Sequence, residues 1–356
     1  MSLIDYCGKI ALVVFVFVAI GFGIWESSIL PPDPLKVKPS VYVAQGAKFF
    51  DVGNRTIEYF EFGTEKGAPV LVIAGERNTG KFFKFYDEWA KKKEIRLLAI
   101  SLPGYGLSDN EEGRRLEDYR DATELVNNLK LDKFYVAGVH LGAIHAALTA
   151  TQNPQKVLGI GLFAPSVPLT KLATLTDLTW LEHAYTQYST VAYFPDMFSF
   201  VAAYTFWSDY PSSESYLETS SPSELAILNK TPQVKEALVW DAVRAFNRTA
   251  RGYAEFPRLV NTPFNINWKD LASKKTIISI GKKDAAASFQ EEYLKLLPNS
   301  QVVTYEDQGR YHPYTHFEDL LVKLLEKKTS STAQTTTSPA ASKAPQADAK
   351  TTKTEL

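Results

Sequence analysis

The part of the sequence that decides the fold is a ten-residue stretch, Phe134-Tyr135-Val136-Ala137-Gly138-Val139-His140-Leu141-Gly142-Ala143. Its apolar, β-branched and aromatic start predicts a buried strand. An Ala- and Leu-rich helix pattern follows from Ala143 to Thr151. Gly138 and Gly142 stand two residues either side of His140, where they let the backbone turn sharply without a Cβ clash. Strand, glycine-flanked turn and helix are the layout of a nucleophile elbow, whose tip is expected to be Ser, Cys or Asp. Here the tip is His140.

Alternating strand and helix patterns surround this stretch. Residues 47–52 and 56–62 alternate around Gly53-Asn54 and predict a β-hairpin. Strands are predicted at 70–75, 96–100, 157–163, 276–281 and 301–305, and helices at 82–89, 116–129, 289–297 and 316–327. The alternation predicts an α/β fold with an open, mostly parallel sheet and helices on both faces.

The alternation stops between Ser166 and Trp268, a segment rich in aromatic residues with helical patches at 177–188 and 232–246. The segment leaves one strand end and returns to the next, so it predicts an inserted helical cap over the edge where such sheets bind ligands. The expected domain division is a core in two parts, 46–165 and 269–328, with a cap at 166–268.

The N-terminal residues 1–30 contain an uncharged, mostly apolar run at residues 10–25. As a helix this run would rise about 24 Å, against a hydrocarbon core of about 30 Å. It predicts a single-pass transmembrane anchor, with a cleaved signal peptide as the alternative. Either interpretation places the main domain in a lumen or outside the cell, and sequons at Asn54, Asn229 and Asn247 agree with a glycoprotein.

The remaining ends are polar. Residues 31–45 form a Pro- and Lys-rich linker, and residues 329–356 have a composition typical of disorder. The chain ends in Lys353-Thr354-Glu355-Leu356, which differs at one residue from a luminal retention signal. The alternatives are a terminus that binds a PDZ-type partner and a chance match. The 356 residues carry a formal charge of −1, which gives no electrostatic reason to expect nucleic-acid binding. The single cysteine, Cys7, excludes an intramolecular disulfide.

Three motifs in order make the chain resemble the α/β-hydrolase superfamily from about Phe49 to Glu326. The first, at 101–109, is similar to the family's Asp-x-Pro-Gly-x-Gly-x-Ser turn, and the second is the elbow with its serine replaced. The third, Gly281-Lys282-Lys283-Asp284, is similar to the turn that supplies the acid of the catalytic triad. The resemblance implies an α/β-hydrolase fold with a degenerate nucleophile elbow.

The resemblance also implies positions for the catalytic groups. His140 holds the nucleophile position, Asp284 the acid position, and either Arg310 or His312 the base position, depending on a local shift. The oxyanion hole would use the backbone N–H groups of Leu141 and Glu76. Two further positions depart from the family pattern, because Ala74 replaces the usual His before Gly75 and Ser101 replaces the usual Asp.

Two classes of function follow. Loss of the serine favours a non-hydrolytic protein that uses the pocket and cap to bind an apolar ligand or a protein partner. The alternative is a hydrolase of ester- or lipid-like substrates, which would use His140, Asp284 and His312, or a serine supplied by Ser101, Ser108 or Ser166. No cofactor and no metal ion are expected.

Overall fold

The computed structural model describes residues 45–175, 180–191, 194–199, 222–246 and 248–326. The predicted anchor at 1–30, most of the linker, Cys7, the sequon at Asn247 and the tail at 329–356 lie outside these residues. Among the residues that are described, no helix is both long and apolar enough to cross a membrane.

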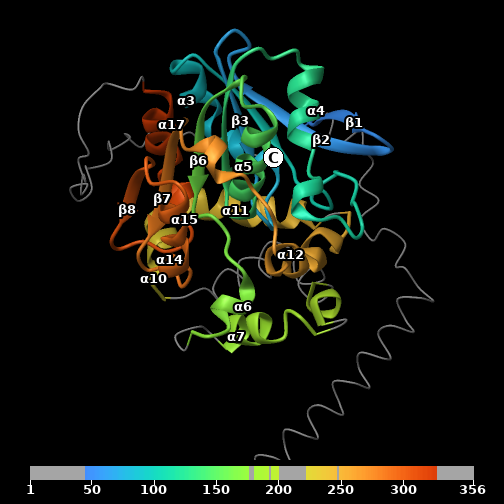
Figure 1. Ribbon diagram of the computed structural model, residues 1–356, viewed down its shortest axis with the longest axis vertical. Helices are drawn as coiled ribbons and strands as arrows, with labels where there is room; N and C mark the ends of the chain where they lie inside the picture. The colour runs from blue at the N-terminus through green and yellow to red at the C-terminus, as the bar shows by residue number, and fades with distance from the viewer. Residues whose placement is uncertain (1–44, 176–179, 192–193, 200–221, 247, 327–356) are drawn as a thin grey trace, which may run out of the picture.

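An eight-stranded sheet forms the centre of the molecule, with the order β1-β2-β4-β3-β5-β6-β7-β8 (Figure 1). β2 pairs antiparallel with β1 and β4, and every other pairing is parallel. The strands are β1 (Lys48–Val52), β2 (Arg55–Gly63), β3 (Ala68–Ile73), β4 (Ile95–Ile100), β5 (Phe134–Val139), β6 (Val157–Phe163), β7 (Lys275–Gly281) and β8 (Gln301–Tyr305). This confirms the predicted fold class and the predicted hairpin.

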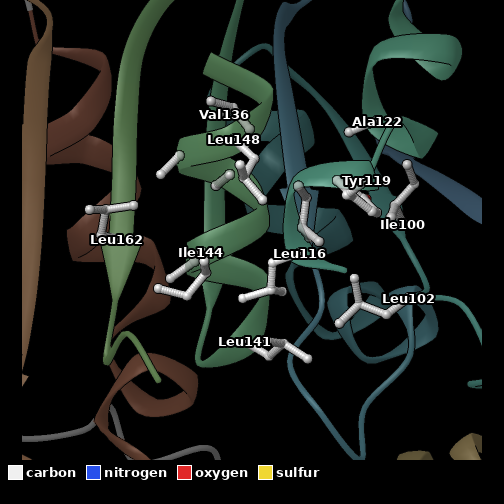
Figure 2. Close-up of a cluster of buried hydrophobic side chains, with 14 of the residues drawn as sticks. Ile100, Leu102, Leu116, Tyr119, Ala122, Val136, Leu141, Ile144, Leu148 and Leu162 are labelled. Atoms are coloured by element: carbon white, nitrogen blue, oxygen red, sulfur yellow. The ribbon is translucent and has the colours of Figure 1, made fainter. Parts of the chain in front are cut away.

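Helices cover both faces of the sheet because successive strand residues point to opposite sides. Leu71, Ile73 and Val136 pack into one apolar cluster with the helices α4 (Asp121–Asn128) and α5 (Leu141–Gln152). Figure 2 shows Ile144 and Leu148 of α5 beside Val136 and Leu162 in this cluster. The alternate strand residues pack on the other face against α3 (Asp87–Lys92) and α17 (Phe317–Leu325); they include Val70, Val72, Ala137 and Val139.

Three predicted helices are interrupted. The helix predicted at 116–129 is wrong at its start: a 3-10 turn, η2 (Leu116–Asp118), ends at Tyr119, and α4 begins at Asp121. Tyr119 leaves the helical conformation because its buried ring packs edge-on to His145, 4.2 Å between centroids. The segment at 82–89 starts as the 3-10 helix η1 (Gly80–Tyr86), and that at 289–297 divides into α14 (Ala287–Gln290) and α15 (Glu292–Leu296).

In its described residues the insertion after β6 is helical, as predicted, and most of its helices gather at one end of the sheet (Figure 1). They contact loops that follow strands: Asp241 of the insertion accepts a hydrogen bond from the Thr79 N–H after β3, at 2.8 Å. The helices between β6 and β7 are α6 (Leu169–Leu172), α7 (Trp180–Gln187), α10 (Pro222–Lys230), α11 (Pro232–Ala245), α12 (Arg251–Asn261) and α13 (Trp268–Leu271). After β8 come α16 (His312–Thr315) and α17.

The elbow between β5 and α5 has the geometry that its sequence predicts. His140 adopts φ 51° and ψ −118°, a conformation that is unfavourable for a residue with a side chain. The flanking glycines are required by close approach: a Cβ on Gly138 would lie 2.0 Å from the Gly142 carbonyl oxygen, and one on Gly142 would lie 2.2 Å from the Ile73 carbonyl oxygen. Backbone packing therefore fixes the turn whatever side chain stands at its tip.

We expect Gly138→Ala to lower the free energy of unfolding by more than about 3 kcal/mol, because the new methyl group meets rigid backbone. Gly159→Ala on the neighbouring strand is the control: its Cβ would meet the side chains of Leu324 and Tyr135 at 3.1 Å, which can shift. Urea unfolding followed by circular dichroism measures both. Equal losses for the two variants would contradict the packing explanation.

Candidate functional site

His140 is buried at the elbow, with 5% of its surface exposed. Its Nε2 lies 3.0 Å from the Arg310 carbonyl oxygen, which can only accept, so Nε2 carries the proton. The ring packs edge-on to Tyr314, 5.7 Å between centroids. Burial lowers the pKa of His140, Glu76 raises it and Arg310 lowers it again, so the net direction is down and the imidazole is neutral at pH 7.

The Glu76 side chain occupies the hydrogen bond expected for an oxyanion. Its Oε2 accepts from the Leu141 N–H at 3.1 Å, and its Oε1 accepts from Arg310 Nη2 at 3.0 Å. Glu76 is 4% exposed, and burial alone would raise its pKa. His140, Arg310, Arg77 and the Leu141 N–H outweigh burial and hold the pKa below its ordinary value. The carboxylate is therefore charged and lies at the N-terminus of α5, where the helix dipole favours a negative group.

The structure thus differs in detail from the predicted oxyanion hole. Leu141 and Glu76 do meet, as the family resemblance implied, but through the carboxylate of Glu76 and not through two backbone donors aimed at one point. The Leu141 N–H is the donor that the resemblance assigned to substrate, and the protein's own carboxylate now accepts from it.

Arg310 is held from three sides. Its guanidinium pairs with Glu76, its carbonyl accepts from His140, and its own N–H donates to Glu224 Oε1 at 3.0 Å. Glu224 belongs to α10 of the insertion. The insertion therefore helps to fix the loop after β8, and the loop brings an arginine, where the family resemblance implied a histidine, against the elbow.

His312 is completely buried, and both of its ring nitrogens have partners. Nδ1 lies 2.8 Å from the Gly309 carbonyl oxygen and so donates to it, which leaves Nε2 to accept from the Ser279 hydroxyl at 2.9 Å. Burial lowers the pKa of His312 to about 3. The neutral imidazole joins β7 to the loop before α16, and no hydrogen bond of the described residues joins it to His140 or Asp284.

Asp284 lies at the carboxyl end of β7, as its motif predicts, but its oxygens serve the next helix. Oδ1 accepts from the Ala286 N–H at 2.9 Å, and Oδ2 accepts from Gln290 Nε2 at 3.0 Å. Within the described part of the chain, neither oxygen accepts from a histidine. The structure therefore brings His140, Glu76, Leu141 and Arg310 together, and it leaves Asp284 and His312 on separate partners.

The candidate serines have other roles. Ser101 Oγ donates to Glu58 Oε2 at 2.8 Å and accepts from the Gly80 N–H, while Ser108 Oγ donates to the Ser101 carbonyl oxygen. Both are fully buried. Ser166 donates its N–H to the His140 carbonyl oxygen at 3.2 Å, which ties the segment after β6 to the elbow.

Three groups that contact the site were not predicted from the sequence. The Glu76 side chain, Tyr314 and Ser279 all contact the predicted site residues. Ser279 lies inside a strand and carries no motif. Glu76, however, follows Gly75 at the predicted oxyanion hole, and Arg310 stands at the base position of the ungapped alignment. Two opposite charges at these positions could have predicted the ion pair.

A sequence profile for the alpha/beta hydrolase fold matches residues 69–317. The chain belongs to this family. Among solved structures, a carboxylesterase from the thaumarchaeon Nitrososphaera gargenis superposes with a TM-score of 0.59 at 16% identity, covering 78% of this chain and 97% of that one. An enol-lactonase from Burkholderia xenovorans gives a TM-score of 0.55 at 14% identity, with 78% and 99% covered. At these identities the likeness concerns the fold.

One curated relative is similar over part of its length. The acetyltransferase component of an acetoin cleaving system from Pseudomonas putida is 29% identical over 119 residues, which are 32% of this chain and 31% of that protein. This chain thus spans about a third of the relative it matches. Separately, no cluster of three or more His, Cys, Asp or Glu side chains suited to a metal ion occurs among the residues whose structure is described.

We expect His140 to be neutral at pH 7 with its proton on Nε2, and to gain a proton only below its ordinary pKa of about 6.5. Because the unfolded chain binds that proton first, the residue lowers the free energy of unfolding as the pH falls below about 6.5. Long-range ¹H–¹⁵N spectra of the histidine ring report both charge and tautomer. In Glu76→Gln the pKa should fall further, since Glu76 raises it. A charged His140 at pH 7, or a proton on Nδ1, would contradict the geometry.

Proposed function

We propose that this protein is a non-hydrolytic member of the α/β hydrolase fold family that binds an apolar ligand or a protein partner between the elbow and the insertion. The observation that carries the proposal is the hydrogen bond from the Leu141 N–H to the Glu76 carboxylate. A hydrolase of this family needs that N–H for the negative charge that develops in its transition state. In this protein the Glu76 carboxylate already accepts a hydrogen bond from that N–H.

Opening the site by moving Glu76 would be costly. Removing one member of a buried ion pair costs about 3–5 kcal/mol, because the other charge is left uncompensated. The partner in question is Arg310, whose side chain is 26% exposed, so we expect the lower end of that range. His140 adds a second obstacle, since it has no hydroxyl to form an acyl ester and donates its ring proton to a carbonyl.

The alternative function is hydrolysis of ester- or lipid-like substrates, which the esterase neighbours suggest by analogy of fold. It would use His140, Asp284 and His312, or an unrecognised serine. The serine of the described residues that contacts an imidazole most directly is Ser279, on His312 at 2.9 Å. Both residues are completely buried, which argues against access by a substrate.

Membrane attachment belongs to the same proposal. The apolar run at 10–25 supports a single-pass anchor, and we propose that the main domain faces a lumen or the extracellular side. Asn54 and Asn229 support this orientation, because both sequon asparagines are exposed and accessible to glycosylation. Asn54 lies in the turn of the β1–β2 hairpin, and Asn229 lies on α10.

The insertion supplies apolar surroundings, although much of its aromatic content packs on itself. Tyr185 stacks on Tyr253 at 5.5 Å between centroids and contacts Phe198 at 4.6 Å. Tyr185 and Tyr253 are buried, which indicates that they build the insertion's own core.

The decisive experiment is labelling of the purified protein with a fluorophosphonate, which reacts with activated serines. We expect no labelling of the wild type. We also expect none of His140→Ser, because Glu76 still accepts from the Leu141 N–H and no imidazole is held toward position 140 as a base. An active carboxylesterase serves as the positive control.

Mass spectrometry locates any label. Labelling of the wild type at a serine would overturn the proposal in favour of the hydrolytic alternative. Labelling of His140→Ser alone would show that the nucleophile is the sole missing group, which would contradict the conclusion that Glu76 blocks the Leu141 N–H.

A further inference from the structure

A groove of about 650 Å³ lies between η1 and α11, and none of its lining residues belongs to the site around His140. Volumes of about 300–1,000 Å³ are typical of small-molecule sites. Ala237, Trp240 and Arg244 stand three and four residues apart on α11, so they share one helix face. Lys81, Lys84 and Phe85 of η1 form the opposite wall.

The groove has a mostly apolar surface with large exposed side chains. Trp240 is 54% exposed and Phe85 is 44% exposed, and Val243 and Ala237 add to the apolar lining. Trp240 and Phe85 keep exposed apolar surface on facing walls, and a ligand that covers this surface gains from the hydrophobic effect. A flat apolar chain or ring is the occupant that these walls suit.

The positive charges of the groove exceed its negative charges. Arg244 is paired with Glu58 beneath the groove, and the Asp241 carboxylate accepts three hydrogen bonds from Asn78 and Thr79. Lys81 Nζ donates to the Gln45 carbonyl oxygen, and neither Lys81 nor Lys84 forms an ion pair with a carboxylate of the described residues. The two lysines therefore leave an uncompensated positive potential at the rim.

The titration of Lys81 agrees with this geometry. Burial, Lys84 and Arg244 together lower its pKa to about 8, although Glu58 and Asp241 act in the opposite direction. A neighbouring anion would reverse these effects, because a negative charge favours the charged amine.

We propose that the groove between η1 and α11 binds a single-chain organic anion, with its acidic head at Lys81 and Lys84 and its apolar chain along Phe85 and Trp240. The acidic head is a carboxylate or phosphate monoester, since a compact ammonium group binds such anions as a point charge. Two hydrogen bonds connect the groove to the residues around the elbow. Asn78 donates to Asp241 in the groove, and the Tyr314 hydroxyl donates to Asn78 at 2.6 Å.

The test uses the whole protein and dodecanoate, with affinity measured by calorimetry. We expect Lys84→Glu to weaken binding roughly tenfold or more, which corresponds to about 1.4 kcal/mol. Trp240→Ala should also weaken it, and Lys84→Arg should retain it. Lys84 and Trp240 are exposed, so these changes should leave the fold intact. The matched control is Lys66→Glu, the same charge change at the exposed turn between β2 and β3.

Three outcomes would overturn the proposal. One is no measurable dodecanoate binding, and another is binding that Lys66→Glu weakens as much as Lys84→Glu. The third is equal affinity for dodecanol, which has no charge. Affinity should fall as the pH rises through about 8, where Lys81 loses its proton, and a rising affinity would contradict the assignment of the head.

A flotation assay with phosphatidylserine vesicles separates the two sources of such an anion. Binding to monomeric dodecanoate supports the proposal, whether or not vesicles also bind. Binding to vesicles without binding to dodecanoate would overturn it in favour of a membrane-docking surface. Because the groove and the elbow share no residue, these results are independent of the fluorophosphonate experiment.

Discussion

The Glu76 carboxylate lies between the Leu141 N–H and the Arg310 guanidinium, and the chemistry of the site depends on this contact. A buried carboxylate remains charged only where hydrogen bonds and opposite charge offset the loss of solvent. The first turn of α5 and Arg310 supply both. In return, Glu76 fixes the loop after β8, and that loop places the Arg310 carbonyl against His140. The Glu76–Arg310 ion pair thus keeps Glu76 charged and holds the carbonyl that fixes the tautomer of His140. It also keeps Glu76 on the Leu141 N–H.

The elbow itself persists for a separate reason. Gly138 and Gly142 are required because backbone atoms lie within about 2 Å of where a Cβ would stand, and the strained φ of His140 follows from that packing. The architecture of the turn therefore does not depend on which side chain stands at position 140. The inserted helices contribute to the same site through Glu224 on the Arg310 N–H and Asp241 on Thr79. The fold of this protein therefore does not depend on the chemistry of its site. The family relationship identifies the fold more firmly than the chemistry.

Local patterns were sufficient to predict the sheet, because most strands are short apolar or alternating runs and glycines mark the turns after β3, β4 and β5. β6 and β8 begin and end where the sequence predicts. The break at Tyr119 was not predictable from helical periodicity, since it depends on a ring contact with His145. The site was predicted as a set of positions but not as a set of contacts. His140, Glu76 and Leu141 do meet, whereas Asp284 accepts from Ala286 and Gln290, and His312 accepts from Ser279. These choices depend on tertiary distances that no motif encodes.

The hydrogen bond from Leu141 to Glu76 is accessible to direct measurement, because His140-Leu141 is the one His-Leu pair in the sequence. Protein labelled with ¹³C-carbonyl histidine and ¹⁵N-leucine gives a single correlated amide, that of Leu141. A charge-assisted bond predicts a downfield amide proton that exchanges slowly with solvent. In Glu76→Ala the proton should move upfield and exchange at least about tenfold faster, while Glu65→Ala at an exposed turn should change neither. A Leu141 amide whose shift and exchange are the same in wild type and Glu76→Ala would contradict the account.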